Sequence, residues 1–225
     1  MFCLFFSDGN KWWQKDDALH TVSEHEASGN LLFERKLFSK AFNIYGKAFS
    51  AASDKGLMGK IPSPLLKMGM CQRKFAEYER DLTKQLVSAR IASHHIGLAL
   101  DTCHFNEEGS QSSEWILSAV KEASIIEKLF FEVLIPQIDD RTKRLQAAEE
   151  FADELLSIYL LDHPFQDVSV TVNKQVAFMA FDEASDCLKS NDHQGGRQNL
   201  QIMVKCLERA NASYALQRKN DPELT

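Results

Sequence analysis

The sequence predicts an all-α protein, an array of about eight antiparallel helices. Apolar residues spaced three and four apart recur along most of the chain, which is the spacing of an amphipathic helix. The 225 residues include ten glycines and five prolines, about half of the ~12% share of an average protein. No long stretch alternates apolar and polar residues as half-buried strands do. Helices are therefore the expected elements throughout.

Breaker residues divide this pattern into segments with short connections, so neighbouring helices should run antiparallel. Asp16 or Asp17 suits the start of the first helix, because a carboxylate complements the exposed N–H groups there. Asp54-Lys55-Gly56 supplies a glycine stop to the second helix. The expected helices cover 17–33, 37–52, 65–101 with a break, 114–134 before Pro136, 140–161, 173–189 and 198–218.

The connections are predicted from residues that disfavour a helix. Ile61-Pro62-Ser63-Pro64 makes 57–64 a connector, since proline lacks the N–H group that a helix interior needs. The polar run HFNEEGSQSS at 104–113 is expected to be an exposed loop, and Gly195-Gly196 to separate the last two helices. Residues 168–172 alternate like a short strand that leads into the next helix.

A single helical domain is expected over 17–219. Residues 1–16 precede it as an apolar and aromatic lead that contains Trp12-Trp13, and 220–225 follow as a flexible tail. The lead either caps the end of the array or presents an apolar anchor to a partner.

One segment carries a specific pattern of small and aromatic residues, GNLLFERKLFSKAFNIYGKAFSA at 29–51. Ala41 and Ala48 are seven residues apart and share one helix face with Tyr45 between them. Small side chains on such a face let a second helix pack closely. The pattern consists of Gly29, Phe33, Phe38, Ala41, Tyr45 and Ala48.

These six positions resemble a tetratricopeptide (TPR) repeat over about residues 22–55, with Gly29 at the small position of the first helix. One repeat cannot bury its own apolar faces, so the resemblance implies a longer TPR-like array. Its expected parts are a TPR-like part at 17–101, the loop at 104–113 and further helical hairpins at 114–219.

A weaker copy of the pattern follows. Ala92, Ile96 and Ala99 repeat the spacing of four and three residues. Arg80 stands where the glycine of the preceding helix is expected, so this second copy is degenerate.

TPR-like proteins hold a peptide or helix of a partner protein in a groove, and the resemblance implies a non-catalytic protein-binding scaffold. One subgroup grips a terminal carboxylate with Lys, Asn and Arg side chains. Asn30 stands in the first Asn position, but Glu26 replaces the expected Lys, which argues against a complete carboxylate clamp. An acidic peptide is instead expected to meet Asn30 together with Lys67, Arg73 and Lys74 from the next helix.

Charge is distributed unevenly along a chain whose formal net charge is −6. Residues 35–90 contain twelve Lys or Arg and four acidic residues, a net charge of +8, so the remaining residues carry −14. The basic region favours an acidic partner, although solvated helix faces would explain it equally. It also leaves a nucleic-acid-binding alternative, with Phe75 or Tyr78 stacking on bases. The acidic pI of about 5.7 and the lack of a reader motif make nucleic acid the less favoured partner.

No phosphate loop, nucleophile motif or cofactor motif is found. His94-His95 with Cys103 and His104 keep a small metal-dependent helical enzyme as an alternative. Adjacent histidines point about 100° apart on a helix, however, and the sequence announces no third ligand. The acidic residues between Glu149 and Glu154 are expected to form a solvated face. We therefore predict no enzyme, no cofactor and no metal site.

The five cysteines are widely spaced, which favours single reduced thiols over a disulfide framework. The apolar residues 1–6 are too few for the apolar core of a signal peptide, and no stretch approaches the length of a membrane span. These observations predict a cytoplasmic protein, with the nucleus also compatible. The oligomeric state is left open.

Overall fold

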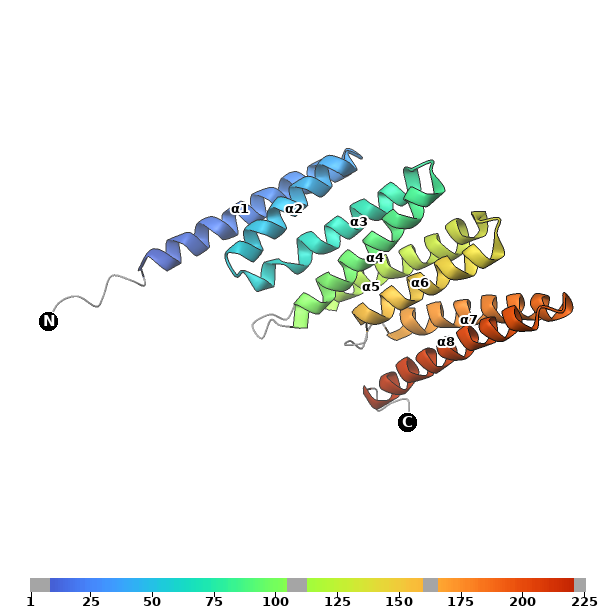
Figure 1. Cartoon of the computed structure of the whole chain (residues 1–225). Helices are drawn as coiled ribbons and strands as arrows, with labels where there is room; N and C mark the ends of the chain where they lie inside the picture. The colour runs from blue at the N-terminus through green and yellow to red at the C-terminus, as the bar shows by residue number, and fades with distance from the viewer. Residues whose placement is uncertain (1–8, 105–112, 160–165, 221–225) are drawn as a thin grey trace.

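The computed structural model describes residues 9–104, 113–159 and 166–220, with side chains over 16–100, 102, 115–155 and 168–215. Every regular element in this part of the chain is a helix, and Figure 1 shows a row of hairpins laid side by side from the N- to the C-terminus. The prediction of an all-helical protein with eight α-helices packed in chain order is confirmed for these residues. They are α1 (Gly9–Glu34), α2 (Phe38–Asp54), α3 (Pro62–Tyr78), α4 (Leu82–His104), α5 (Ser113–Lys128), α6 (Arg141–Tyr159), α7 (Gln166–Lys189) and α8 (His193–Asn220).

Each helix packs on helices that are close to it in the chain. The pairs α1 and α2, α3 and α4, and α7 and α8 form antiparallel hairpins with contact along their lengths (Figure 1). The hairpins join because α2 contacts α3, α4 contacts both α5 and α6, and α6 contacts α7. Three single turns complete the chain: the 3-10 turns η1 (Met58–Lys60) and η3 (Ile135–Gln137), and the π-helical turn η2 (Leu129–Leu134).

The core between the η2 turn and α6 is aromatic. The rings of Phe130 and Phe151 stack with their centroids 4.0 Å apart, and Phe131 meets Phe151 edge to face at 5.7 Å. All three side chains are buried. They belong to one apolar core that extends from Val22 on α1 to Cys206 on α8, so the hairpins form a continuous stack.

Helices α1, α2 and α7 end in the same way, with one residue of positive φ and two backbone hydrogen bonds that satisfy the last carbonyl groups. After α2, Gly56 has φ 62°, and Leu57 N–H donates to Ala52 O at 2.8 Å. This is the Schellman motif, and it confirms the predicted glycine stop. Lys36 and Asn191 take the same role after α1 and α7 with φ of 59° and 61°.

Helices α4, α6 and α8 begin on an aspartate whose side chain accepts a backbone N–H from the first turn. The acceptors Asp81, Asp140 and Asp192 lie 3.1, 3.1 and 2.9 Å from the donor nitrogens of Lys84, Lys143 and Gly195. Such a cap stabilises a helix start by roughly 1 kcal/mol.

Two predicted helix boundaries are wrong because glycine and proline were assigned to connections. Pro62 and Pro64 lie in the first turn of α3. Backbone N–H groups in a first turn have no acceptor within the helix, so proline, which lacks this group, costs no hydrogen bond there. Gly195 and Gly196 lie in the first turn of α8, after the cap on Asp192. The true break between α7 and α8 is at 190–192.

The predicted strand at 168–172 is also wrong. These residues lie near the start of α7, and Val168, Val170 and Val172 are all at most 9% exposed. The alternation of apolar and polar residues over 168–172 does not indicate a strand here. Helix α7 is covered by other helices on several sides and therefore buries residues that point in different directions. Burial on more than one side removes the helical periodicity from the sequence.

The acidic residues of α6 form interhelical ion pairs, which corrects the expected solvated face. Glu150 and Glu154 both accept hydrogen bonds from Arg90 on α4. Arg90 Nη1 donates to Glu150 Oε2 at 2.9 Å, and Arg90 Nε donates to Glu154 Oε2 at 2.9 Å. On the other side of α6, Glu149 accepts from Lys205 Nζ on α8 at 2.8 Å, and Asp153 pairs with Arg209.

Parts of several predictions fall outside the described residues. α1 begins at Gly9, so the predicted helix start at Asp16 or Asp17 is wrong and the second half of the predicted 1–16 lead is helical. The side chains of Trp12 and Trp13, most of the predicted 104–113 loop and residues 221–225 are not described. No described helix combines the length and the apolar character needed to cross a membrane.

Candidate functional site

The close approach expected at Gly29 is present in the first hairpin. Gly29 on α1 faces the ring of Tyr45 on α2, and a Cβ atom at position 29 would lie 2.5 Å from Tyr45 Cε1. Ala41 and Ala48 are fully buried on the same face of α2 as Tyr45. The small residues thus allow an aromatic ring to fill the space between the two helices.

Asn30, a predicted partner-binding residue, is exposed, and its Oδ1 accepts a hydrogen bond of 2.8 Å from the Tyr45 hydroxyl. Lys67, another such residue, lies one helical turn before the buried Cys71, which packs in the same cluster as Tyr45. Burial raises the pKa of the Cys71 thiol to about 12, although the charge of Lys67 acts in the opposite direction. Asn30 and Lys67 therefore adjoin one small cluster, and the Asn30 oxygen already has a donor.

Arg73 and Lys74, the remaining predicted partner-binding residues, are engaged inside the molecule. The guanidinium of Arg73 pairs with Glu122 on α5 and with Glu77, and the Arg73 side chain is only 8% exposed. Lys74 Nζ lies 2.6 Å from Glu77 Oε2. A partner role for Arg73 stays a prediction, and burial against α5 disfavours it.

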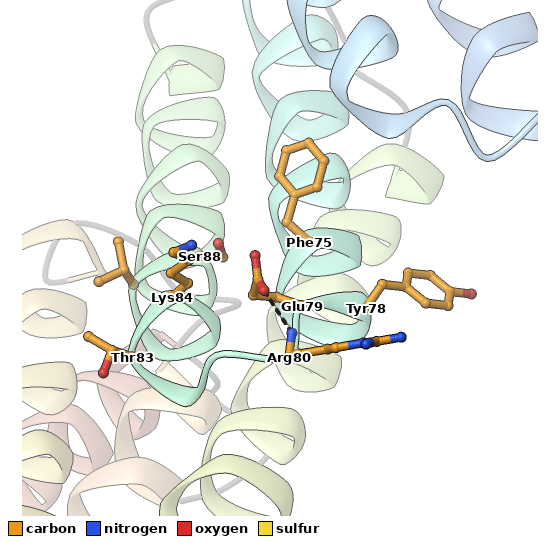
Figure 2. A pocket seen from close by; sticks show the side chains of 8 residues that line it. Phe75, Tyr78, Glu79, Arg80, Thr83, Lys84 and Ser88 are labelled. Carbon is orange, nitrogen blue, oxygen red and sulfur yellow. Dashed lines mark hydrogen bonds between the residues drawn. The ribbon is translucent and has the colours of Figure 1, made fainter.

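The structure contains an open hollow at the turn between α3 and α4, with a volume of about 660 Å³. Figure 2 shows Phe75 and Tyr78 on α3, Thr83, Lys84 and Ser88 on α4, and Glu79 and Arg80 in the turn between them. We call this feature the α3–α4 hollow; Val87 completes its lining.

The apolar side of the α3–α4 hollow is held by a row of aromatic rings. Tyr78 stacks on Phe38 with centroids 5.8 Å apart and planes 13° from parallel, and Phe38 meets Phe33 at 5.1 Å. Tyr78 is nevertheless 62% exposed. Phe75 contacts Phe42 of α2 at 6.5 Å. The first hairpin thus contacts an exposed tyrosine through a stacked ring, that of Phe38.

The polar side of the hollow carries the cations Arg80 and Lys84 beside two carboxylates. Glu79 accepts from the backbone N–H groups of Arg80 at 2.7 Å and Asp81 at 3.3 Å, and these bonds lower the pKa of Glu79. Asp81 caps α4. Arg80 and Lys84 have no ion pair with any described residue. The hollow therefore combines an exposed aromatic ring with two cations that form no salt bridge with described residues.

The sequence suggested Phe75 and Tyr78 only as aromatic rings that could stack on nucleic-acid bases. It placed Arg80 at the helix position where a TPR-like repeat has a glycine. Arg80 is not in a helix; the close contact in the second hairpin is at Gly69, where a Cβ would lie 2.8 Å from Ile96 Cγ1. The available signal was the run 78–81, whose polar residues mark the helix break where the hollow forms.

Among the described residues His94 and His95 do not form a metal site, and the side chains of Cys103 and His104, the other members of the proposed alternative, lie outside the described residues. His95 Nδ1 contacts Ile91 O at 2.8 Å, and burial lowers the pKa of His95. The rings of His94 and His95 lie 6.4 Å apart. Among described residues no group of three or more His, Cys, Asp or Glu side chains has the arrangement of a metal site.

No protein-family model matches the chain, and no curated protein matches its sequence.

Proposed function

We propose that the protein is a non-catalytic, TPR-like scaffold that binds an acidic, partly apolar segment of a partner protein at the α3–α4 hollow. The observation that carries the proposal is the exposed Tyr78 ring, stacked on Phe38, in one hollow with Arg80 and Lys84, which have no ion pair with a described residue. Exposed, preorganised aromatic and arginine side chains are the residues that dominate protein–protein binding energies.

The charge of the surrounding surface supports an acidic partner. Of the twelve Lys and Arg residues over 35–90, Arg73, Lys74 and Arg90 have ion pairs with described residues. The other nine have none there, and they are Arg35, Lys36, Lys40, Lys47, Lys55, Lys60, Lys67, Arg80 and Lys84. A surface with unpaired cations attracts acidic segments and accelerates their association.

The TPR-like character of the array is supported by local contacts. Gly29 against Tyr45 and Gly69 against Ile96 place a glycine of the first helix on a large residue of the second in two successive hairpins. The three described cysteines, Cys71, Cys187 and Cys206, are free thiols. This supports a reducing compartment, the cytoplasm or the nucleus, as the place of action.

Selection from a random peptide library on the immobilised protein tests the proposal. We expect selected peptides to be enriched in Asp and Glu together with an aromatic or aliphatic residue. For a selected peptide, Tyr78→Ala and the pair Arg80→Glu with Lys84→Glu should each weaken binding at least about tenfold, the effect of losing an interface hot spot.

Lys47→Glu is the matched control, because Lys47 is exposed on α2 and does not line the hollow. It should leave the affinity within about twofold, since isolated rim charges contribute little. Selection that is unaffected by the hollow variants would refute the site. Preference for a single-stranded oligonucleotide over acidic peptides would favour the nucleic-acid alternative instead.

A further inference from the structure

The last described hairpin exposes six large apolar side chains. On α7, Phe178, Phe181 and Leu188 are 70%, 53% and 47% exposed. On α8, Val204, Leu207 and Tyr214 are 47%, 46% and 49% exposed. We call this set the terminal face.

The six residues share one side of the hairpin. On α7 they lie three and seven residues apart, and on α8 also three and seven apart, so each trio forms one stripe. The opposite side of the hairpin packs on α6, where Lys205 and Arg209 pair with Glu149 and Asp153. The terminal face is therefore directed away from the stack, where a further hairpin of an array would dock.

A large apolar side chain has roughly 150–250 Å² of surface to bury, with aromatic side chains at the upper end. Six such side chains that are about half exposed therefore offer an apolar surface area on the order of 500 Å². This is near the upper limit of ~300–600 Å² for the largest apolar patch on a monomer. Two such faces together supply about 1,000 Å² of apolar area, most of the ~1,200–2,000 Å² of a specific interface.

The charged residues on either side of Phe178 are opposite in sign, so those of one copy can pair with those of a second copy. Lys174 and Asp182 lie four residues before and four residues after Phe178, on the exposed side of α7. Neither has an ion pair with a described residue. If two α7 helices cross antiparallel at Phe178, Lys174 of each copy lies opposite Asp182 of the other. A twofold interface has this reciprocity, in which residue i contacts residue j and j contacts i.

We infer that the terminal face binds the terminal face of a second copy of this chain, which gives a twofold dimer joined end to end through α7 and α8. The apolar residues form the centre of the interface, and the Lys174–Asp182 pairs on either side of Phe178 set its register. This inference does not depend on the α3–α4 hollow, which lies at the other half of the stack.

Sedimentation equilibrium over a series of protein concentrations tests the inference. The wild-type protein should dimerise, and Phe178→Asp should raise the dimer dissociation constant at least about tenfold, because it places a charge at the centre of the interface. Leu117→Asp is the control: Leu117 is 66% exposed on α5, away from the terminal face, and its replacement should leave the dimer unchanged. Circular dichroism should show the same helix content for all variants.

A charge-exchange experiment tests the register. Lys174→Glu and Asp182→Lys should each weaken the dimer severalfold, because each places like charges opposite one another. The double variant should restore the wild-type dissociation constant. A monomeric wild-type protein, a dimer that persists in Phe178→Asp, or a double variant weaker than both single variants would overturn the inference.

Discussion

A methyl group at Gly29 would lie 2.5, 2.7 and 2.9 Å from three atoms of the buried Tyr45 ring. The ring is confined by Ala41 and Cys71, and its hydroxyl donates to Asn30, so it cannot move without loss of packing. We therefore expect Gly29→Ala to lower the free energy of unfolding by roughly 1–3 kcal/mol, the usual cost of overpacking. Urea unfolding followed by circular dichroism measures the change.

Gly46→Ala is the matched control on the partner helix. Nothing lies within 4 Å of a Cβ at Gly46, so only the helix propensity changes. This variant should be more stable than wild type by about 0.5–1 kcal/mol. If both alanine variants were stabilised, Gly29 would have no role in the close approach of α1 and α2.

Glu127 on α5 predicts a dependence of stability on pH. It is 7% exposed, and burial, with a smaller contribution from Glu132, raises its pKa. The folded protein therefore binds this proton more tightly than the unfolded chain. Between the ordinary pKa of 4.5 and the raised folded value, the contribution of Glu127 to the free energy of unfolding should fall as pH rises, and it should then level off.

Glu127→Gln should remove this loss and raise the melting temperature at neutral pH. Its amide can still accept from Gln175 Nε2, now 3.1 Å from Glu127 Oε1, and it adds a donor for the buried Gln175 Oε1, which has no partner. Below pH 4.5 the variant and wild type should converge. Glu208→Gln, at an exposed position on α8, is the control and should change little. An unchanged melting temperature for Glu127→Gln at neutral pH would contradict the argument.

At the scale of elements, short polar signals end the helices and a few interhelical contacts decide how they pack. Aspartates begin α4, α6 and α8, and residues of positive φ end α1, α2 and α7. These signals involve only a few neighbouring residues, so some of them could be predicted from the sequence, as the end of α2 at Gly56 was. The contacts between helices join residues far apart in the chain, and the Arg73–Glu122 pair of α3 and α5 is the most buried of the ion pairs.

Arg73→Met should destabilise the protein by about 3–5 kcal/mol, because it leaves the Glu122 carboxylate buried without its partner. The side chains of Arg73 and Glu122 are each 8% exposed, so solvent screens the pair weakly. Chemical denaturation at neutral pH measures the loss.

The double variant Arg73→Met with Glu122→Leu separates this effect from simple loss of packing. Replacing both charges by apolar residues of similar size is often close to neutral, so the double variant should recover most of the stability. A double variant at least as unstable as Arg73→Met alone would show that the loss comes from packing and not from the unpaired charge.

At the scale of the whole molecule, part of the uneven charge of the chain is neutralised by ion pairs between distant segments. Arg73 and Arg90 from the basic region 35–90 pair with Glu122, Glu150 and Glu154 from the acidic remainder of the chain. The net charges of the two regions therefore overstate what the surface offers to partners. Nine cations of 35–90 have no ion pair with a described residue and lie on α2, α3, α4 and the turns beside them, where the α3–α4 hollow forms, whereas the apolar terminal face lies on α7 and α8.

Local residue patterns were sufficient to predict the helices, most of their ends and the close approach of a second helix at Gly29, because propensity, capping and side-chain size act over a few neighbouring residues. Tertiary structure decided what those patterns leave undetermined. It placed the alternating 168–172 segment in a buried helix, turned Arg73 inward to Glu122 and exposed Tyr78 beside Arg80. The physical reason is that burial and ion pairing depend on residues brought together from distant parts of the chain, which no local pattern records.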